Sequence, residues 1–407
     1  MKQMSKLAID GGRKLFEQDI RFPAWPPVKE STAKRLYELY MKQNWSFYGP
    51  EELKFAADFA AYHDAKYGTF MNNGTVTLET ALHVLGIGPG DEVIVPAWTW
   101  MATAMAVLYV GATPVFVDGE KDTFCMDPEA LEEAITSRTR AVIPVHLFGS
   151  MADMDKIMAI AAKHGLKVVE DCAHAHGGKW NGKGLGSFGD IGSFSFQQSK
   201  IMTAGEGGLC TTDDEDLYDR IGRYSHIGYG LGAKQGKPST PPPADLDPRN
   251  YRATDFQAVI LQDQLAALEE DSRRRAANAD YLHKELRSIP GISTQQPGRC
   301  ATMQQYYVYG ITVDPSALKE GKTRDDVIAA VTAEGATNLF AGWGEPAFRQ
   351  RLFQVSPDRY RVASSAVVED IIHNRIILGG IQWLDGDRSN CEKLVAVFRK
   401  VMEEYGR

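Results

Sequence analysis

One lysine stands apart in the stretch Asp-Ile-Gly-Ser-Phe-Ser-Phe-Gln-Gln-Ser-Lys-Ile-Met-Thr-Ala-Gly-Glu-Gly-Gly, residues 190–208, which holds no other basic residue. An apolar strand over 191–196 precedes Lys200, and a glycine-rich turn over 203–208 follows it. In a partly dry pocket the pKa of a lysine falls, and the free amine then forms a Schiff base with an aldehyde or ketone. The alternative is a lysine that extends from a strand end into solvent while the glycines close a hairpin.

A second segment with chemical potential is Asn-Asn-Gly-Thr at residues 72–75, between an aromatic strand and a helix. Gly74 and Thr75 fall at the helix N-terminus, where backbone amides and the positive helix end favour a phosphate. The alternative is a plain helix cap, a role that Thr75 fills equally well.

Aromatic and acidic side chains follow two further strands. Trp98 and Trp100 come after the strand 92–96, where a tryptophan stacks on a flat heterocycle or simply joins the core. Asp171 follows two valines that we expect to be buried, so its carboxylate needs a cationic partner or several donors, unless it only caps a turn. His174 and His176 form a weak H-x-H pattern, and with no acidic or cysteine ligands beside it we expect no metal site.

The elements that must position these residues alternate between strand and helix up to about residue 265. The expected strands are 92–96, 114–118, 141–146, 167–171, 191–196 and 208–212, and the expected helices include 75–85, 127–136 and 154–164. This order predicts an α/β fold with a mostly parallel sheet flanked by helices, in which ligands bind at the carboxyl ends of the strands.

Past residue 265 the pattern predicts a smaller α+β domain. A long charged helix over 262–287 comes first, then strands over 306–313 and 376–381 and helices over 324–334 and 390–404. We therefore expect an N-terminal arm (1–25), a large domain (26–265) and a small C-terminal domain (266–407). The proline- and glycine-rich segment 228–248 reads as a surface loop, and whether it closes over the site stays open.

Composition excludes several classes of protein. The chain has 407 residues, a formal net charge of −8 and five scattered cysteines, which disfavours a nucleic-acid or anionic-membrane partner and a disulfide framework. We predict a cytoplasmic protein without a signal peptide. Residues 93–117 are uncharged, but turn residues divide them, so they predict a buried β-α-β unit and not a membrane span.

Together, a phosphate cradle, a stacking aromatic, a buried aspartate and a reactive lysine meet the needs of pyridoxal 5′-phosphate (PLP). The chain resembles the DegT/DnrJ/EryC1/StrS aminotransferase family, a group of fold type I (aspartate aminotransferase-like) PLP-dependent transferases, over roughly residues 25–265. The similar strings are 73–75, 96–100, 144–149, 170–174, 194–208 and Asn250-Tyr251-Arg252.

The resemblance implies a role for each site residue. Lys200 would bind the cofactor covalently and move the proton, and Asp171 would pair with the pyridine nitrogen. His174 would lie near the ring hydroxyl, and Trp100 would stack on the ring. Gly74, Thr75 and Ser195 would hold the phosphate. Asn250 would reach the phosphate of a neighbouring subunit, which implies a homodimer with shared active sites.

Within the family, residues 196–208 are most similar to the cyclitol branch, which includes aminohydroxybenzoate synthases and acts in aminocyclitol antibiotic pathways. The implied reaction is ping-pong transfer of an amino group from glutamine or glutamate to a keto-cyclitol such as an inosose. The alternatives are a nucleotide-keto-sugar aminotransferase, a non-catalytic PLP-binding regulator, and a PLP-dependent sugar dehydratase, against which Lys200 argues because the dehydratases carry histidine there. Gly342-Trp343-Gly344 and residues 379–383 depart from the histidine-containing strings of these relatives.

Overall fold

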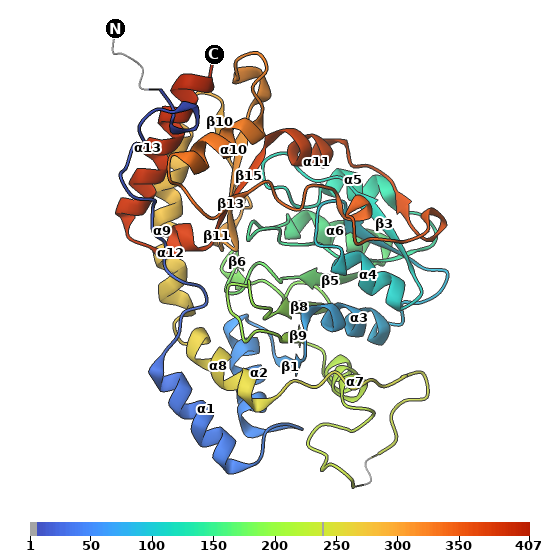
Figure 1. Cartoon of the computed structure of the whole chain (residues 1–407). Coiled ribbons are helices and arrows are strands. Elements are labelled where there is room, and N and C mark those ends of the chain that lie inside the picture. The colour runs from blue at the N-terminus through green and yellow to red at the C-terminus, as the bar shows by residue number, and fades with distance from the viewer. Residues whose placement is uncertain (1–5, 238–239) are drawn as a thin grey trace.

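A large, mostly parallel sheet forms the centre of the protein in the computed structural model, which describes residues 6–237 and 240–407 (Figure 1). Its strand order is β1-β9-β8-β5-β4-β2-β3-β14, and β9 alone among these strands runs antiparallel to its neighbours. The strands are β1 (Tyr67–Met71), β2 (Glu92–Pro96), β3 (Thr113–Val117), β4 (Thr139–Val142), β5 (Lys167–Asp171), β8 (Ile191–Ser195), β9 (Gly208–Thr212) and β14 (Arg361–Val362).

Helices flank this sheet, as the alternating pattern predicts (Figure 1). They are α2 (Pro50–Tyr62), α3 (Gly74–Val84), α4 (Ala102–Tyr109), α5 (Pro128–Ala134), α6 (Met154–His164), α7 (Glu215–Ser225) and α8 (Asp255–Leu265). The expected strands 92–96, 167–171 and 208–212 have the observed bounds, whereas β4 ends at Val142, four residues before the expected end. The uncharged segment 93–117 is the β-α-β unit β2-α4-β3, and no helix of residues 6–237 or 240–407 has the length and hydropathy to cross a membrane.

The C-terminal third builds a smaller antiparallel sheet of order β10-β12-β15-β13, which confirms the expected α+β character. Its strands are β10 (Ile292–Thr294), β12 (Val308–Val313), β13 (Leu339–Phe340) and β15 (Ile376–Gly380). The helices α9 (Leu268–Leu286), α10 (Arg324–Ala333) and α13 (Arg388–Tyr405) pack with it. A third, small sheet joins β11 (Ala301–Met303), β6 (Lys179–Trp180) and β7 (Lys183–Gly184).

The single helix expected over 262–287 is wrong, because the chain breaks between α8 and α9 at residues 266–267. The side-chain amide of Gln264 accepts from the backbone N–H of Thr203 at 2.8 Å and donates to its carbonyl oxygen at 2.7 Å. This pair of bonds fixes the end of α8 to the loop that carries Lys200, whereas α9 packs against α13. The helical pattern of the sequence continues across residues 266–267, so the break is caused by tertiary contacts and not by the local sequence.

Residues 6–25, the described part of the N-terminal arm, pack on the small domain before the chain enters the large one (Figure 1). Leu7 and Ile20 belong to the small hydrophobic core, and the buried carboxylate of Glu334 accepts from the backbone N–H groups of Ala8 and Leu15 at 2.9 Å. In the other direction, residues 347–372 return to the large core, where β14 pairs with β3. The division at residues 25/26 and 265/266 therefore stays a prediction about folding units.

Candidate active site

The carboxyl ends of the parallel strands meet around a cavity of about 840 Å³, a volume typical of small-molecule sites. Asp171 ends β5, Ser195 ends β8, and Trp100 follows β2. The cavity is lined by seven of the eight residues expected at the site: Gly74, Thr75, Trp100, Asp171, His174, Ser195 and Lys200.

Lys200 extends from the turn after β8 into this cavity. Its backbone N–H donates to the Gln197 carbonyl oxygen at 2.9 Å, and its Nζ lies 4.7 Å from the ring centroid of Tyr307. Burial lowers the pKa of the lysine to about 8, although the nearby Asp171 carboxylate acts to raise it. The glycine-rich turn does close a β8–β9 hairpin, but the lysine faces the cavity and not bulk solvent.

Asp171 is a buried carboxylate, 6% exposed, with few partners. Its Oδ2 accepts from the Thr103 hydroxyl at 3.0 Å, and its Oδ1 accepts from the Ala173 backbone N–H at 3.2 Å, so it also caps a turn. Burial raises the pKa of Asp171, against these two hydrogen bonds and the charge of Lys200, which lower it. The nearby charge of Lys200 therefore does not offset the burial of this carboxylate.

His174 is held as a neutral donor. The Phe148 backbone N–H donates to its Nδ1 at 3.3 Å, which assigns the ring proton to Nε2. Burial, and then the charge of Lys200, hold the pKa of His174 well below its ordinary value. Its ring stacks on Tyr307 with centroids 4.1 Å apart, which fixes its orientation at the cavity wall.

The N-terminus of α3 is set against the end of β8. A Cβ atom added at Gly74 would lie 2.5 Å from the Cβ of Ser195, so this close approach requires glycine. The helix cap is Asn73, whose Oδ1 accepts from the backbone N–H groups of Thr75 and Val76 at 3.0 Å. The alternative of Thr75 as the cap is therefore wrong, and the Thr75 side chain lines the cavity instead.

The two tryptophans after β2 have different environments. Trp98 is 1% exposed and belongs to the core, whereas Trp100 is 42% exposed and lines the cavity. The neighbouring ring is that of Trp343, whose centroid lies 5.8 Å from that of Trp100. The aromatic surface expected at this strand end is thus present, and a residue 243 positions later extends it.

Three residues that contact the expected site residues were not themselves expected there from the sequence: Thr103, Tyr307 and Trp343. Thr103 lies one helical turn after Thr99, and their hydroxyls are 2.9 Å apart, a spacing that indicates a shared face. Tyr307 and Trp343 come from the C-terminal third, and their sequence gives only a weak signal. For Trp343 that signal is the pair of flanking glycines, Gly342 and Gly344, which both adopt positive φ.

His146, Glu170 and Cys172 come together behind the site with ligand atoms within 4.8 Å of one another, although no acidic or cysteine partner was expected beside the histidines. His146 and Glu170 already have hydrogen-bond partners. The Ala152 backbone N–H donates to His146 Nδ1 at 3.2 Å, so His146 Nε2 carries the proton and faces Glu170 Oε2 at 3.4 Å. Burial raises the pKa of the Cys172 thiol well above its ordinary value. This arrangement is a structural hydrogen-bond network.

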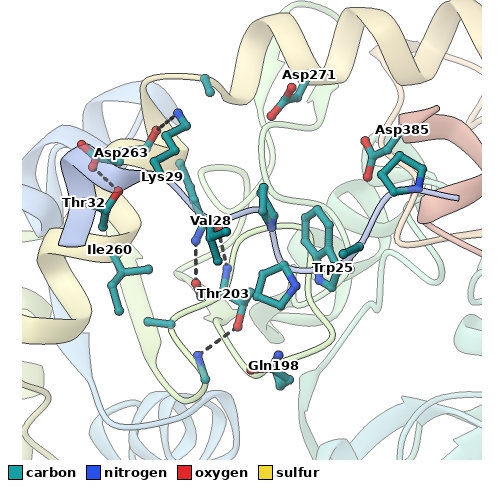
Figure 2. A pocket seen from close by; sticks show the side chains of 18 of the residues that line it. Trp25, Val28, Lys29, Thr32, Gln198, Thr203, Ile260, Asp263, Asp271 and Asp385 are labelled. Atoms are coloured by element: carbon teal, nitrogen blue, oxygen red, sulfur yellow. Dashed lines mark hydrogen bonds between the residues drawn. The ribbon is translucent and has the colours of Figure 1, made fainter. Parts of the chain in front are cut away.

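A second cavity, of about 640 Å³, lies against the same lysine-bearing loop, and Figure 2 shows its residues. Gln198 and Thr203 line it, together with the arm residue Trp25. Its carboxylates are paired with cations: Asp263 accepts from Arg35 at 2.8 Å, and Asp385 accepts from Arg275 at 2.6 Å. We therefore assign the reactive chemistry to the cavity that holds Lys200.

Asn250, the eighth expected residue, lies outside the lining of the cavity. It is exposed and forms an antiparallel bridge with His226, at the base of the loop that contains 228–248. Figure 1 shows the described parts of this loop, 228–237 and 240–248, extending from the large domain beside α7. Within one chain, Asn250 therefore does not join the other seven residues.

The chain is similar to known proteins both in sequence and in structure. Residues 27–388 match the DegT/DnrJ/EryC1/StrS aminotransferase family. A putative L-glutamine:3-amino-2,3-dideoxy-scyllo-inosose aminotransferase of Micromonospora echinospora is 38% identical, over 87% of this chain and 83% of its own. An L-glutamine:2-deoxy-scyllo-inosose aminotransferase of Streptomyces fradiae is 36% identical over 98% of each chain. The crystal structure of 3-amino-5-hydroxybenzoic acid synthase superposes with a TM-score of 0.82 at 29% identity, covering 95% of this chain and 100% of that one.

Proposed function

This chain belongs to the DegT/DnrJ/EryC1/StrS aminotransferase family, and we propose that it transfers the amino group of L-glutamine to a keto-cyclitol of the scyllo-inosose type. It is a PLP-dependent aminotransferase of fold type I. The observation that carries the proposal is the Lys200–Asp171 pair in a cavity where the other described lining residues include no arginine or lysine. The chain also covers its inosose-aminating relative almost completely.

The residues present fit PLP. Asp171 is a buried carboxylate whose pKa stays raised despite the nearby charge of Lys200, so a protonated pyridine nitrogen would be a further cationic partner for it. The glycine at position 74 brings the positive end of α3 against Ser195, where a phosphate is favoured. Bound PLP supplies an aldehyde that reacts with amines and a ring that accepts electrons when a substrate carbon loses a proton.

Lys200 supplies the amine that binds the cofactor and then moves the proton. Because burial lowers the pKa of Lys200 to about 8, a useful fraction of its amine is uncharged near neutral pH and able to accept a proton. The amine lies over Tyr307, and the Tyr307 hydroxyl is 2.9 Å from that of Ser199, which limits the directions that the lysine can take. Lys200 is thus the nucleophile and the general base.

Asp171 and His174 set the charge on the cofactor ring. The Thr103 hydroxyl and the Ala173 N–H orient the Asp171 carboxylate, which would hold a proton on the pyridine nitrogen of bound PLP. Because its Nδ1 accepts from the Phe148 N–H, His174 would donate its Nε2–H to the ring hydroxyl of bound PLP.

The remaining roles concern binding. The hydroxyls of Thr75 and Ser195 would hold the phosphate, together with the field of α3, since Asn73 already occupies the Thr75 and Val76 amides. Trp100 offers its exposed ring for stacking.

A panel of acceptors tests this function. Keto-cyclitols and nucleotide keto-sugars are offered with glutamine, glutamate or alanine, and aminated product is measured by mass spectrometry. We expect the highest rate with 2-deoxy-scyllo-inosose and glutamine. Amination of nucleotide keto-sugars alone would favour the alternative acceptor class, and dehydration without amino transfer would contradict the reaction.

Asn250 leads to a proposal about assembly: it binds the phosphate in the active site of a second copy, so that the homodimer shares its two sites. Its support is the resemblance and the position of Asn250, exposed and outside the cavity of its own chain. Co-expressing Lys200→Ala with Asn250→Ala subunits tests it. If sites are shared, the mixed dimer has one doubly altered site and one intact site, so activity rises above that of either parent. No gain in isolated mixed dimers, with Asn250→Ala alone clearly impaired, would refute shared sites.

A further inference from the structure

A short turn from the C-terminal third reaches the site through two glycines. Gly342 and Gly344 have φ of +74° and +78°, a left-handed conformation that side chains disfavour, and Trp343 lies between them. The turn is fastened to the large domain just after it: the Ala347 N–H donates to the Ala97 carbonyl oxygen at 2.8 Å, and Gln350 Nε2 donates to the Thr99 carbonyl oxygen at 3.0 Å. The position of the Trp343 ring is therefore built into the fold.

The Trp343 ring continues the aromatic wall of the cavity. Its centroid lies 5.8 Å from Trp100, 5.5 Å from Phe148 and 6.1 Å from His174. His174 in turn stacks on Tyr307, the ring that lies over the Lys200 amine. Trp343 is thus one ring removed from the residue that covers the reacting lysine, on the wall of the same cavity.

The charges around this wall disfavour an anionic substrate. Among the described residues that line the cavity, Lys200 is the single lysine or arginine, whereas Glu79, Asp171 and Glu206 are acidic. A nucleotide diphosphate requires cationic or helix N-terminal partners. The helix N-terminus here, that of α3, holds the cofactor phosphate in the proposed function.

We infer that Trp343 determines acceptor specificity by forming a platform for an uncharged, polyhydroxylated six-membered ring. The inference rests on the proposed function and assigns its acceptor subsite to one residue. A ring whose hydroxyl groups are all equatorial presents axial C–H groups on both faces. Such a face is apolar and fits an indole, while the hydroxyl edge points to polar groups such as Ser199 and Tyr307, whose hydroxyls line the same cavity.

The test compares Trp343→Ala, Trp343→Phe and the control Leu352→Ala, which alters a 68% exposed side chain a few residues later. The first readout is binding of scyllo-inositol, an unreactive probe, to the cofactor-loaded protein by saturation-transfer NMR. The second is steady-state kinetics with the acceptor and the donor varied separately. The cofactor absorbance and the circular dichroism spectrum of each variant verify that it is folded and loaded.

We expect Trp343→Ala to raise the acceptor KM by about tenfold or more and to abolish the scyllo-inositol signal, while the donor KM changes by less than about twofold. Trp343→Phe should recover most of both, and Leu352→Ala should match the wild type. An unchanged acceptor KM and scyllo-inositol signal in Trp343→Ala would overturn the inference, and so would an equal rise in donor and acceptor KM.

Failure of the proposed function gives a different result. A wild-type enzyme that aminates no keto-cyclitol refutes the function, and the scyllo-inositol signal then decides the platform by itself. If the wild type gives that signal and Trp343→Ala does not, the polyol subsite is supported although the proposed reaction is refuted. If the wild type gives no signal, or if UDP binds the cavity as well as scyllo-inositol does, the subsite is refuted.

Discussion

Two adjacent carboxylates on β5, Glu170 and Asp171, are both buried, yet they point to opposite faces of the strand and meet opposite surroundings. Glu170 accepts from the backbone N–H groups of Phe188, Gly189 and Gly186 at 2.7–3.0 Å and faces the His146 Nε2–H. Burial would raise the pKa of Glu170, but these hydrogen bonds outweigh it and bring the pKa below 4.5. Asp171 has two hydrogen bonds and the nearby charge of Lys200, which together do not offset its burial, so its pKa is raised.

We interpret Glu170 as a structural carboxylate and Asp171 as a carboxylate that is available to a ligand. A carboxylate whose acceptor sites are filled by fixed donors stabilises the fold and has no capacity left for a ligand. A buried carboxylate with incomplete partners costs stability in the free protein and regains it when a cationic group binds. Burial by itself does not distinguish the two, since both side chains are almost fully enclosed.

Lys200→Ala should have the largest effect, because it removes the one amine on the Asp171 side of the strand. We expect turnover to fall by about 10³-fold or more, since both the nucleophile and the proton carrier are lost. Borohydride reduction followed by peptide mass spectrometry should find no cofactor attached to the variant. Lys167→Ala, which alters a half-exposed lysine paired with Asp190 at 2.9 Å on the same strand, is the control. Cofactor attached to another lysine of the wild type would contradict the assignment.

Asp171→Asn should lower turnover by about 10²–10³-fold, because an amide does not hold a proton on the pyridine nitrogen. The melting temperature without cofactor should stay unchanged or rise, since an uncompensated buried acid is removed. Steady-state kinetics and thermal unfolding measure the two effects. Near-normal turnover would show that the Asp171 carboxylate is not needed for catalysis, and would contradict the functional role assigned to it.

Glu170→Gln should give the reverse result, with a loss of stability of about 3 kcal/mol and near-normal turnover per folded molecule. The side-chain amide nitrogen of the introduced glutamine is a donor. It would face a backbone N–H, which is also a donor, at a place where a carboxylate oxygen accepts in the wild type. Because the pKa of Glu170 is lowered on folding, its contribution is complete above pH 4.5 and is lost as the pH falls through the lowered pKa. Urea unfolding at pH 7 and at pH 4 should therefore show a smaller difference between variant and wild type at the lower pH. A Glu170→Gln protein that is as stable as the wild type but inactive would contradict the structural role assigned to Glu170.

The smallest expected effect is a shift in the pH at which the Lys200 amine loses its proton. In protein freed of cofactor, the rate at which borohydride traps added pyridoxal should rise with pH around a midpoint of about 8, because the uncharged amine reacts. Asp171→Asn should move this midpoint down, since the Asp171 charge raises the lysine pKa, whereas Glu170→Gln should leave it in place. A midpoint near 10.5, the ordinary value, would mean that the amine is not desolvated.

The sequence predicted most of the large domain because its signals are local. Strands such as 167–171 and 208–212 are short apolar runs between turns, and alternation with helices determines a parallel sheet. Since such a sheet binds ligands at its carboxyl edge, Asp171, Ser195 and Trp100 could be expected at one site. The chemistry of lysine, aspartate and a helix N-terminus then indicated the class of cofactor.

Only the tertiary structure decided how distant segments complete that site. Tyr307 and Trp343 reach the cavity because the C-terminal third packs over the carboxyl edge of the sheet, and no local pattern encodes that approach. The α8–α9 break likewise depends on a contact between Gln264 and Thr203, residues 61 positions apart. The surroundings that separate Glu170 from Asp171 arise in the same way, because their donors belong to other segments. By itself, the sequence determined the sheet, its ligand-binding edge and the reactive lysine, since short-range periodicity and side-chain chemistry suffice for these. The fold determined which acid is free to act and which rings enclose the substrate, because both depend on contacts between segments far apart in the chain.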